Sequence, residues 1–184
     1  MLHKLTFRHG VHPPELKELT EHIRIRRMPY PDEVVLPLRQ HTGKPAKLIT
    51  RVGELVERGD KIGEADGFIS APVHASASGR VEEVGIWPHP DGTYDTAVRI
   101  KVDPYSAQAA RPRLVPEWEG LTPEQIRQAV QDAGVVGLGG AAFPTHVKLA
   151  PPKDKKIEVL ILNGCECEPY LTTDHRTMVE YPER

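Results

Sequence analysis

A glycine-rich stretch, GVVGLGGAAFPTHVK at residues 134–148, constrains the fold of this chain more than any other feature. Glycine tolerates positive φ and lets the backbone approach a ligand closely, so such a loop can aim several N–H groups at a phosphate. Phe143 and Pro144 stiffen the exit of the loop, and Lys148 adds a positive charge. The glycines alone leave two interpretations open, a nucleotide-binding loop and a plain flexible loop.

An apolar run of strand length, IEVLIL at residues 157–162, ends directly in the polar and acidic sequence NGCECEP. Ligands of α/β folds collect just beyond the carboxyl ends of strands. We therefore expect a strand at residues 157–162, followed by side chains that hydrogen-bond a ring or a ribose. The alternative is an acidic surface turn.

These two motifs carry a family resemblance. The glycine-rich stretch, followed by a strand and by NGCECEPYLTTDHR, resembles the C subunit of the Rnf electron-transport complex. It is also similar to the flavoprotein NADH-binding subunit of respiratory complex I and to cobalamin reductases of bacterial microcompartments. The sequence FRHGVHPPE at residues 7–15 and the sandwich-like middle of the chain favour the Rnf subunit. The resemblance covers essentially the whole chain.

The resemblance implies that FMN and NADH bind at eight positions. Three glycines would lie beside the flavin, an aromatic residue would contact NADH, and a lysine would lie near the FMN phosphate or ring edge. An asparagine would hydrogen-bond the flavin, and two glutamates would lie near the flavin and the nicotinamide. In the order of these roles, the residues are Gly137, Gly139, Gly140, Phe143, Lys148, Asn163, Glu166 and Glu168. The chain departs from the complex I motif at Leu138, in place of arginine, and at Cys165, in place of aspartate.

The chemistry implied by the resemblance is hydride transfer from NADH to FMN, followed by one-electron steps to iron–sulfur centres. The 4Fe-4S cluster motif that family members carry farther along is not in these 184 residues. We therefore expect the amino-terminal portion of a longer sequence, with an incomplete flavin domain. The isolated chain is predicted to bind FMN weakly or not at all and not to oxidise NADH.

The middle of the chain suggests a β domain. VGELVERGDKIGE and ISAPVHASASGRVEEV resemble the barrel-sandwich hybrid fold of lipoyl and biotinyl domains. Carrier domains present a lysine at a hairpin tip, but the corresponding turn at residues 65–68 has none, which argues against lipoylation or biotinylation. Short strands are expected at residues 34–36, 47–49, 54–56, 60–62, 79–81 and 96–102.

The predicted fold class is α+β and multi-domain, a small all-β barrel-sandwich hybrid followed by the beginning of an α/β flavin-binding domain. A leader at residues 1–31 precedes the β domain at 32–103, a linker at 104–120 and the incomplete FMN/NADH-binding domain at 121–184. Thr122 and Gln125 form a capping-box pattern with Pro123 at the first helical position, so a helix is expected to deliver the chain into the glycine loop.

Composition narrows the possible partners and locations. The 24 Lys and Arg against 26 Asp and Glu, a net charge of −2, give no electrostatic case for nucleic acid. No stretch approaches the roughly 18 apolar residues that span a bilayer, and the amino terminus lacks a signal-peptide core. We expect a cytoplasmic protein, peripheral on the cytoplasmic face of a membrane, whose partners are other subunits of an electron-transport complex. The alternative function is a non-catalytic docking module for those subunits.

The cysteines and histidines do not predict a metal site. Cys165 and Cys167 are separated by one residue, where a disulfide would be strained, and they cannot supply four ligands to zinc or a cluster. Reduced structural thiols are expected, with a redox-active thiol as the alternative. His3, His9 and His12 have no acidic or thiol partner at a convincing spacing.

Overall fold

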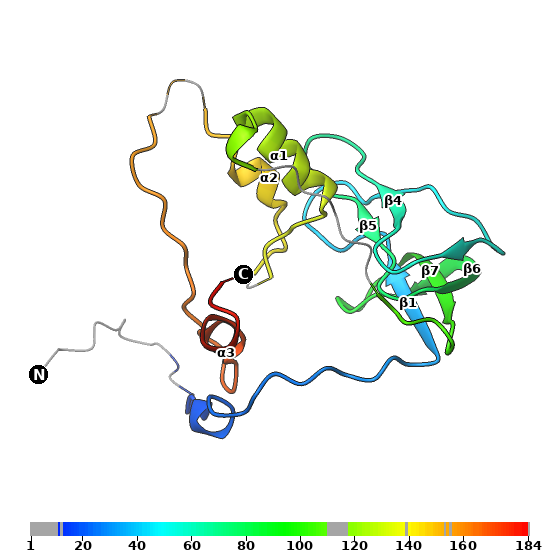
Figure 1. The fold of residues 1–184 in the computed structure, drawn as a ribbon, viewed down its shortest axis with the longest axis horizontal. Helices are drawn as coiled ribbons and strands as arrows, with labels where there is room; N and C mark the ends of the chain where they lie inside the picture. Colours follow the sequence, from blue (N-terminus) through cyan, green and yellow to red (C-terminus); the bar gives the residue numbers. More distant parts are fainter. Residues whose placement is uncertain are drawn as a thin grey trace, which may run out of the picture. The chain divides into compact units, whose positions relative to one another are not determined.

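The structure is a computed structural model that describes residues 11, 13–109, 118–138, 140–152, 154 and 156–183 (Figure 1). The chain forms two compact units: one combines Met1–Met28 with Glu158–Arg184, and the other is Pro29–Ile157. The helices and strands run, in chain order, as η1 (Lys17–Leu19), β1 (Glu33–Pro37), β2 (Lys47–Leu48), β3 (Leu55–Val56), β4 (Lys61–Glu64), β5 (Val73–His74), β6 (Gly79–Pro88), β7 (Tyr94–Val102), η2 (Trp118–Gly120), α1 (Pro123–Asp132), α2 (Thr145–Lys148) and α3 (Thr173–Glu180).

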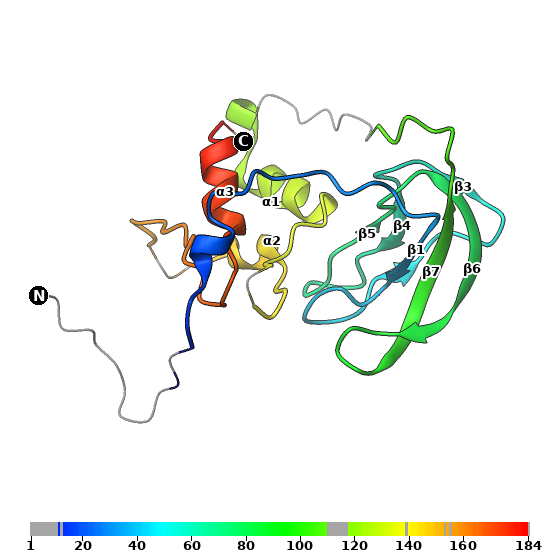
Figure 2. The same ribbon diagram turned by 90° about the horizontal axis from the view of Figure 1, so that it is seen from below.

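The strands of the Pro29–Ile157 unit form two antiparallel sheets. One has the order β1-β7-β6-β3 and the other β2-β4-β5. The long hairpin of β6 and β7 curves along the first sheet in Figure 2, with Gly79 opposite Val102 and Pro88 opposite Tyr94. Its turn contains the predicted Asp91-Gly92 pair, and Gly92 has a φ of 86°. All six expected strands form, with shifted bounds, and β5 was not predicted.

Apolar side chains from both sheets meet in one core. Ile62 from the smaller sheet and Val81, Val98 and Ile100 from the larger one are fully buried. Such β-branched residues suit a pleated surface that is buried on one side. Gly79 completes the packing, because a Cβ at this position would lie 2.0 Å from the carbonyl oxygen of Lys101.

The helix before the glycine loop forms as the sequence predicts. Thr122 caps α1, its side chain accepts a hydrogen bond from the Gln125 amide, and the Gln125 side chain accepts from the Thr122 amide. Helix α1 ends at Asp132, and Gly134 follows with a φ of 69°. The short helix α2 packs against α1 (Figures 1 and 2).

The predicted strand at residues 157–162 is wrong in this structure. The segment belongs to no strand or helix, and its side chains are exposed, with Ile161 at 81% and Leu162 at 87% of full accessibility. A strand is stable only when a neighbour satisfies its N–H and C=O groups. The described residues supply no second strand of an α/β sheet beside this segment.

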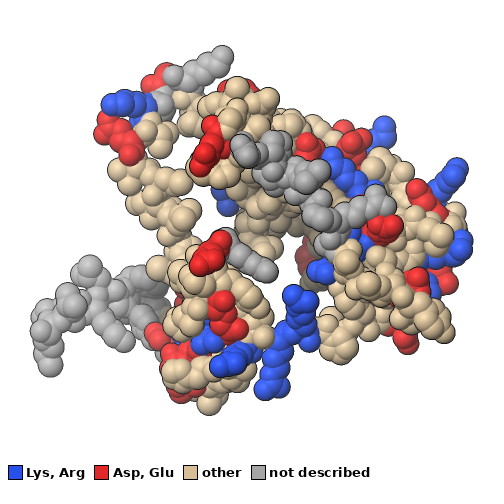
Figure 3. All heavy atoms as spheres, in the orientation of Figure 1, with Lys and Arg blue, Asp and Glu red and all other residues tan. Residues whose placement is uncertain are grey.

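The surface carries charges of both signs. On the face in Figure 3, Lys and Arg side chains are interspersed with Asp and Glu over the β strands. Among the described helices, none has both the length and the apolar character needed to cross a bilayer.

Candidate functional site

The glycine loop is closed at its base like a small hairpin. Val136 and Pro144 form a β-bridge, and the Gly137 amide donates a hydrogen bond of 3.0 Å to the Phe143 carbonyl oxygen. Gly140 and Ala141 are exposed beyond this base. The loop therefore presents backbone rather than side chains to its surroundings, as a close-approach site requires.

Lys148 lies against the backbone of this loop. It is the last residue of α2, and a Cβ at Gly137 would lie 2.9 Å from its Nζ. Glycine at position 137 thus gives the ammonium group access to the loop. A cation beside a glycine-rich backbone is an arrangement that favours a phosphate or another anion.

The β domain holds the exit of the glycine loop. The Thr42 amide donates a hydrogen bond of 3.2 Å to the Ala142 carbonyl oxygen, and the Thr42 hydroxyl donates another to the Ala141 carbonyl oxygen. Ala142 has a φ of 49°, which L side chains seldom adopt. Thr42 therefore fixes a strained backbone conformation from a position between β1 and β2.

A pocket of about 780 Å³ lies between residues 140–142 and the β domain. Its volume falls within the range of small-molecule sites, roughly 300–1,000 Å³. Thr42 and Gly43 line it beside the loop, and Arg39, His89 and Asp91 line it farther along. The pocket makes the glycine loop accessible to a ligand from the side of the β domain.

The charges in this pocket are paired within the fold. Arg39 Nε lies 2.5 Å from an Asp95 oxygen, and Arg39 also lies 2.8 Å from Asp91. His89 Nδ1 is 2.8 Å from Asp91. The hydrogen bond from Arg39, followed by those from Thr93, holds the pKa of Asp91 well below its ordinary value. Arg39 therefore serves the fold, which leaves Lys148 as the cation beside the loop backbone.

The acidic segment belongs to the other compact unit. Asn163 Oδ1 accepts a hydrogen bond of 2.9 Å from the Cys165 amide, which forms a tight turn. Glu168 is exposed, and its carboxylate accepts a hydrogen bond from Cys167 Sγ at 3.4 Å. Asn163 and Glu168 thus lie on a turn whose side chains reach solvent.

Glu166 caps α3. Its carboxylate accepts hydrogen bonds from the amides of Asp174, at 2.8 Å, and His175, at 3.2 Å. Partial burial raises the pKa of Glu166, but these amides and the charge of Lys17 outweigh it, so the pKa lies below its ordinary value. The Glu166 side chain is thus engaged in holding the first turn of a helix.

The predicted site residues fall into two groups. The structure brings Gly137, Phe143 and Lys148 together, with Gly140 at the exposed end of the same loop. Gly139 lies outside the described residues. The remaining three, Asn163, Glu166 and Glu168, share one segment in the second unit, and each unit is described by itself.

Sequence reasoning missed two residues that hold these segments. Thr42 contacts Ala141 from 99 positions away, and Lys17 contacts Glu166 from 149 positions away. Neither residue belongs to a local motif, so no periodicity or spacing pointed to it. Coupled variation among homologous sequences is the signal that could have found them.

Metal ligands do not gather among the described residues. No group of three or more His, Cys, Asp or Glu side chains there is arranged to hold a metal ion. Cys165 and Cys167 are free and exposed. The three histidines considered above, His3, His9 and His12, lie outside the described residues.

A two-sheet β domain joined through a capped helix to an anion-type glycine loop defines a modular class, a barrel-sandwich hybrid followed by the start of a nucleotide-type domain. The sequence model of the RnfC barrel sandwich hybrid domain matches residues 5–105, and that of the Nuo51 FMN-binding domain matches residues 130–184. The chain therefore belongs to the RnfC family. The predicted fold class and the predicted family are both confirmed.

Curated relatives support the same assignment, and each is the C subunit of a redox complex. The chain is 42% identical to that of the proton-translocating ferredoxin:NAD(+) oxidoreductase complex of Clostridium ljungdahlii, over 97% of this chain and 39% of that protein. It is 42% identical to that of the Na(+)-translocating ferredoxin:NAD(+) oxidoreductase complex of Acetobacterium woodii, over 97% of this chain and 40% of that protein. The C subunit of the ion-translocating oxidoreductase complex of Rhodobacter capsulatus is also 42% identical, over 99% of this chain and 35% of its own length. The chain thus spans about two fifths of the first two relatives.

Proposed function

We propose that this chain forms the amino-terminal part of an electron-transport subunit that passes electrons between NADH and iron–sulfur carriers through FMN. The observation that carries the proposal is the glycine loop with Lys148 against the backbone of Gly137. The match of residues 130–184 to the Nuo51 FMN-binding domain supports the flavin. The names of the relatives, which are subunits of ferredoxin:NAD(+) oxidoreductase complexes, support NADH and the neighbouring subunits as partners.

The loop residues suit a phosphorylated flavin. Apart from its chain neighbours, no atom of the described residues lies within 4 Å of the position that a Cβ would take at Gly140, so the loop backbone is open there. Lys148 would neutralise phosphate charge, and Phe143 would offer an apolar surface beside the loop. Asn163 and Glu168 would supply hydrogen bonds from the acidic segment. FMN supplies the chemistry of accepting a hydride and releasing single electrons, while the protein orients it.

The proposed location is the cytoplasmic face of a membrane, where this chain would meet the other subunits of its complex. The described residues contain no helix able to cross a bilayer, so such a location requires docking through surfaces. The 4Fe-4S clusters would be held by residues outside these 184. We therefore assign cofactor binding, rather than complete electron transfer, to this part of the subunit.

The test is an FMN titration followed by flavin fluorescence. The 184-residue chain is compared with the same chain lengthened to the span of its relatives. We expect tight binding by the lengthened chain and weak or no binding by the shorter one. In the lengthened chain, Lys148→Met should weaken binding about tenfold, because a charge-assisted contact is lost, while the exposed-lysine control Lys47→Met should not. Failure of the lengthened chain to bind FMN would overturn the proposal.

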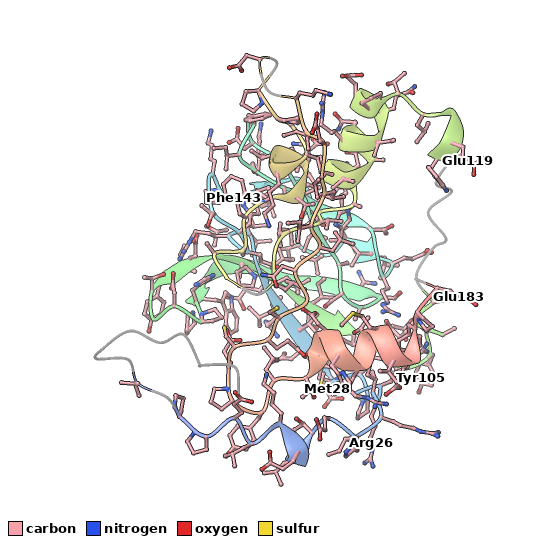
Figure 4. All side chains as sticks on the ribbon, turned by 90° about the vertical axis from the view of Figure 1, so that its left-hand side faces the viewer. Arg26, Met28, Tyr105, Glu119, Phe143 and Glu183 are labelled. Carbon is pink, nitrogen blue, oxygen red and sulfur yellow. The ribbon has the colours of Figure 1, made fainter. Side chains whose placement is uncertain are left out.

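A second candidate function is a docking module for other subunits, in which the flavin motif has only a structural role. One observation favours it: Arg24, Arg26 and Arg27 are exposed in the leader, where they suit an acidic partner (Figure 4). Replacing the three arginines with glutamine would abolish co-purification with the neighbouring subunits and leave FMN binding unchanged. Loss of FMN binding with intact co-purification would contradict this second function.

A further inference from the structure

The amino-terminal leader is attached to the acidic segment through the backbone. The Tyr170 amide donates a hydrogen bond of 2.9 Å to the Glu15 carbonyl oxygen, and the Thr20 hydroxyl donates one of 2.7 Å to the Tyr170 carbonyl oxygen. Figures 1 and 2 both show the leader's short helix η1 beside α3. The leader therefore packs as part of this compact unit, whose two segments are far apart in the sequence.

Lys17 makes the central contact between the two segments. Its Nζ donates hydrogen bonds to the carbonyl oxygens of Glu166, at 2.5 Å, and Leu171, at 2.8 Å. The side chain is partly buried, which strengthens a charge-assisted hydrogen bond relative to one in water. One ammonium group thus bridges both ends of the turn that carries Cys167 and Glu168.

The far end of α3 is held to the leader in the same way. The Ile25 amide donates to the Glu180 carboxylate at 3.0 Å, and Arg176 donates to the Glu21 carbonyl oxygen at 3.0 Å. Arg176 and Glu180 also pair with each other within the helix. Contacts at both ends of α3 leave the leader little freedom to separate while the helix stays folded.

We propose that Lys17 is a positioning residue for the acidic segment, and that the leader is a built-in clamp that orients Glu168 and Asn163. The proposal rests on the proposed function in one respect, namely that this segment faces the flavin. Lys17 acts through the carbonyl groups of Glu166 and Leu171 and touches no cofactor itself. The carbonyl contacts fix the turn, and the Glu166 carboxylate then sets α3 behind it.

The first test is hydrogen exchange in the 184-residue chain, with no flavin added. In Lys17→Met, we expect the amides of Tyr170, Asp174 and His175 to exchange about tenfold faster, because two charge-assisted hydrogen bonds are lost. Lys17→Arg keeps the charge and should restore slow exchange. The control is Lys47→Met, which removes an exposed lysine of β2. Unchanged protection of β6 and β7 verifies that each variant is folded.

The second test measures FMN binding in the chain lengthened to the span of its relatives. There Lys17→Met should weaken binding about tenfold, with recovery in Lys17→Arg and no change in Lys47→Met. Equal exchange in Lys17→Met and Lys47→Met, or no recovery in Lys17→Arg, overturns the positioning role. If the lengthened parent chain binds no FMN, the proposed function fails, while the exchange experiment still decides whether the clamp exists.

Discussion

The hydroxyl of Thr42 donates a hydrogen bond to the backbone carbonyl of Ala141, 99 residues later in the chain. This contact, with the one from the Thr42 amide, ties the glycine loop to the β domain. The β domain therefore supports the conformation of the loop and is more than a neighbouring module. Its contribution can be measured at a single hydroxyl group.

Replacing Thr42 with valine removes the hydroxyl but keeps the shape of the side chain. We expect a loss of about 0.5–1.5 kcal/mol in the free energy of unfolding, the usual net value of one hydrogen bond. Amides at residues 137–145 should exchange faster, because the loop loses an anchor. Urea unfolding and hydrogen exchange measure the two effects. Thr42→Ser retains the hydroxyl and should behave like the parent chain; if it matches Thr42→Val instead, the hydrogen bond is irrelevant.

Gly79 should not tolerate a methyl group. A Cβ there would lie 2.0 Å from the Lys101 carbonyl oxygen, so Gly79→Ala must push β6 and β7 apart. We expect the free energy of unfolding to fall by about 3 kcal/mol. Gly120→Ala is the control, because its Cβ meets no atom of the described residues within 4 Å. Urea denaturation of both variants makes the comparison, and a nearly neutral Gly79→Ala would show that the strands lie farther apart.

Acid should weaken the β domain through Arg39 and its two carboxylates. The Arg39 hydrogen bond lowers the pKa of Asp91 and of Asp95 from an ordinary value of 3.8. The unfolded chain therefore takes up protons first, so the stabilisation is complete well above pH 3.8 and declines as the pH falls below it. We expect the thermal midpoint to drop between about pH 5 and pH 3.

Arg39→Met and Arg80→Met separate this effect from general acid destabilisation. Arg39→Met should flatten the dependence of the thermal midpoint on pH, because both carboxyl groups lose their cation. Arg80 donates to the Gly53 carbonyl oxygen and is the matched control that leaves the carboxylates paired. Identical slopes for the two variants would mean that the acid sensitivity arises elsewhere.

The exposed apolar segment at residues 157–162 should make the isolated chain prone to self-association. An extended backbone with unpaired polar groups and apolar side chains is a template for pairing with another chain. Ile161→Lys should therefore raise the concentration at which light scattering first increases. Tyr105→Lys is the control, since Tyr105 is 96% exposed but stands outside the segment (Figure 4). Equal effects of the two substitutions would argue against pairing through residues 157–162.

Local signals predicted much of the β domain and the first helix. Glycine and proline punctuation located six strands, and the Thr122–Gln125 capping box located the start of α1. Each of these signals acts within a few residues, so one sequence contains all of the information needed. The same holds for the closed base of the glycine loop, where Pro144 follows a short apolar turn.

The remaining features depend on contacts between distant residues. Residues 157–162 have the composition of a strand, but the described residues provide no strand to pair with them, so propensity alone gave the wrong answer. The cap on α3 comes from Glu166, six positions before the ordinary capping residue Thr172. Lys17 and Thr42 act across most of the chain, and nothing near them in sequence indicates their targets.

The contact between Lys17 and Glu166 also sets an order of events during synthesis. Lys17 leaves the ribosome 149 residues ahead of Glu166, and at roughly 5–20 residues per second this interval lasts about 7–30 s. The strands of the β domain are complete well within that interval. The first residues to be made are thus among the last to find their partners, and a nascent chain exposes its leader to chaperones and proteases while the β domain is already folded.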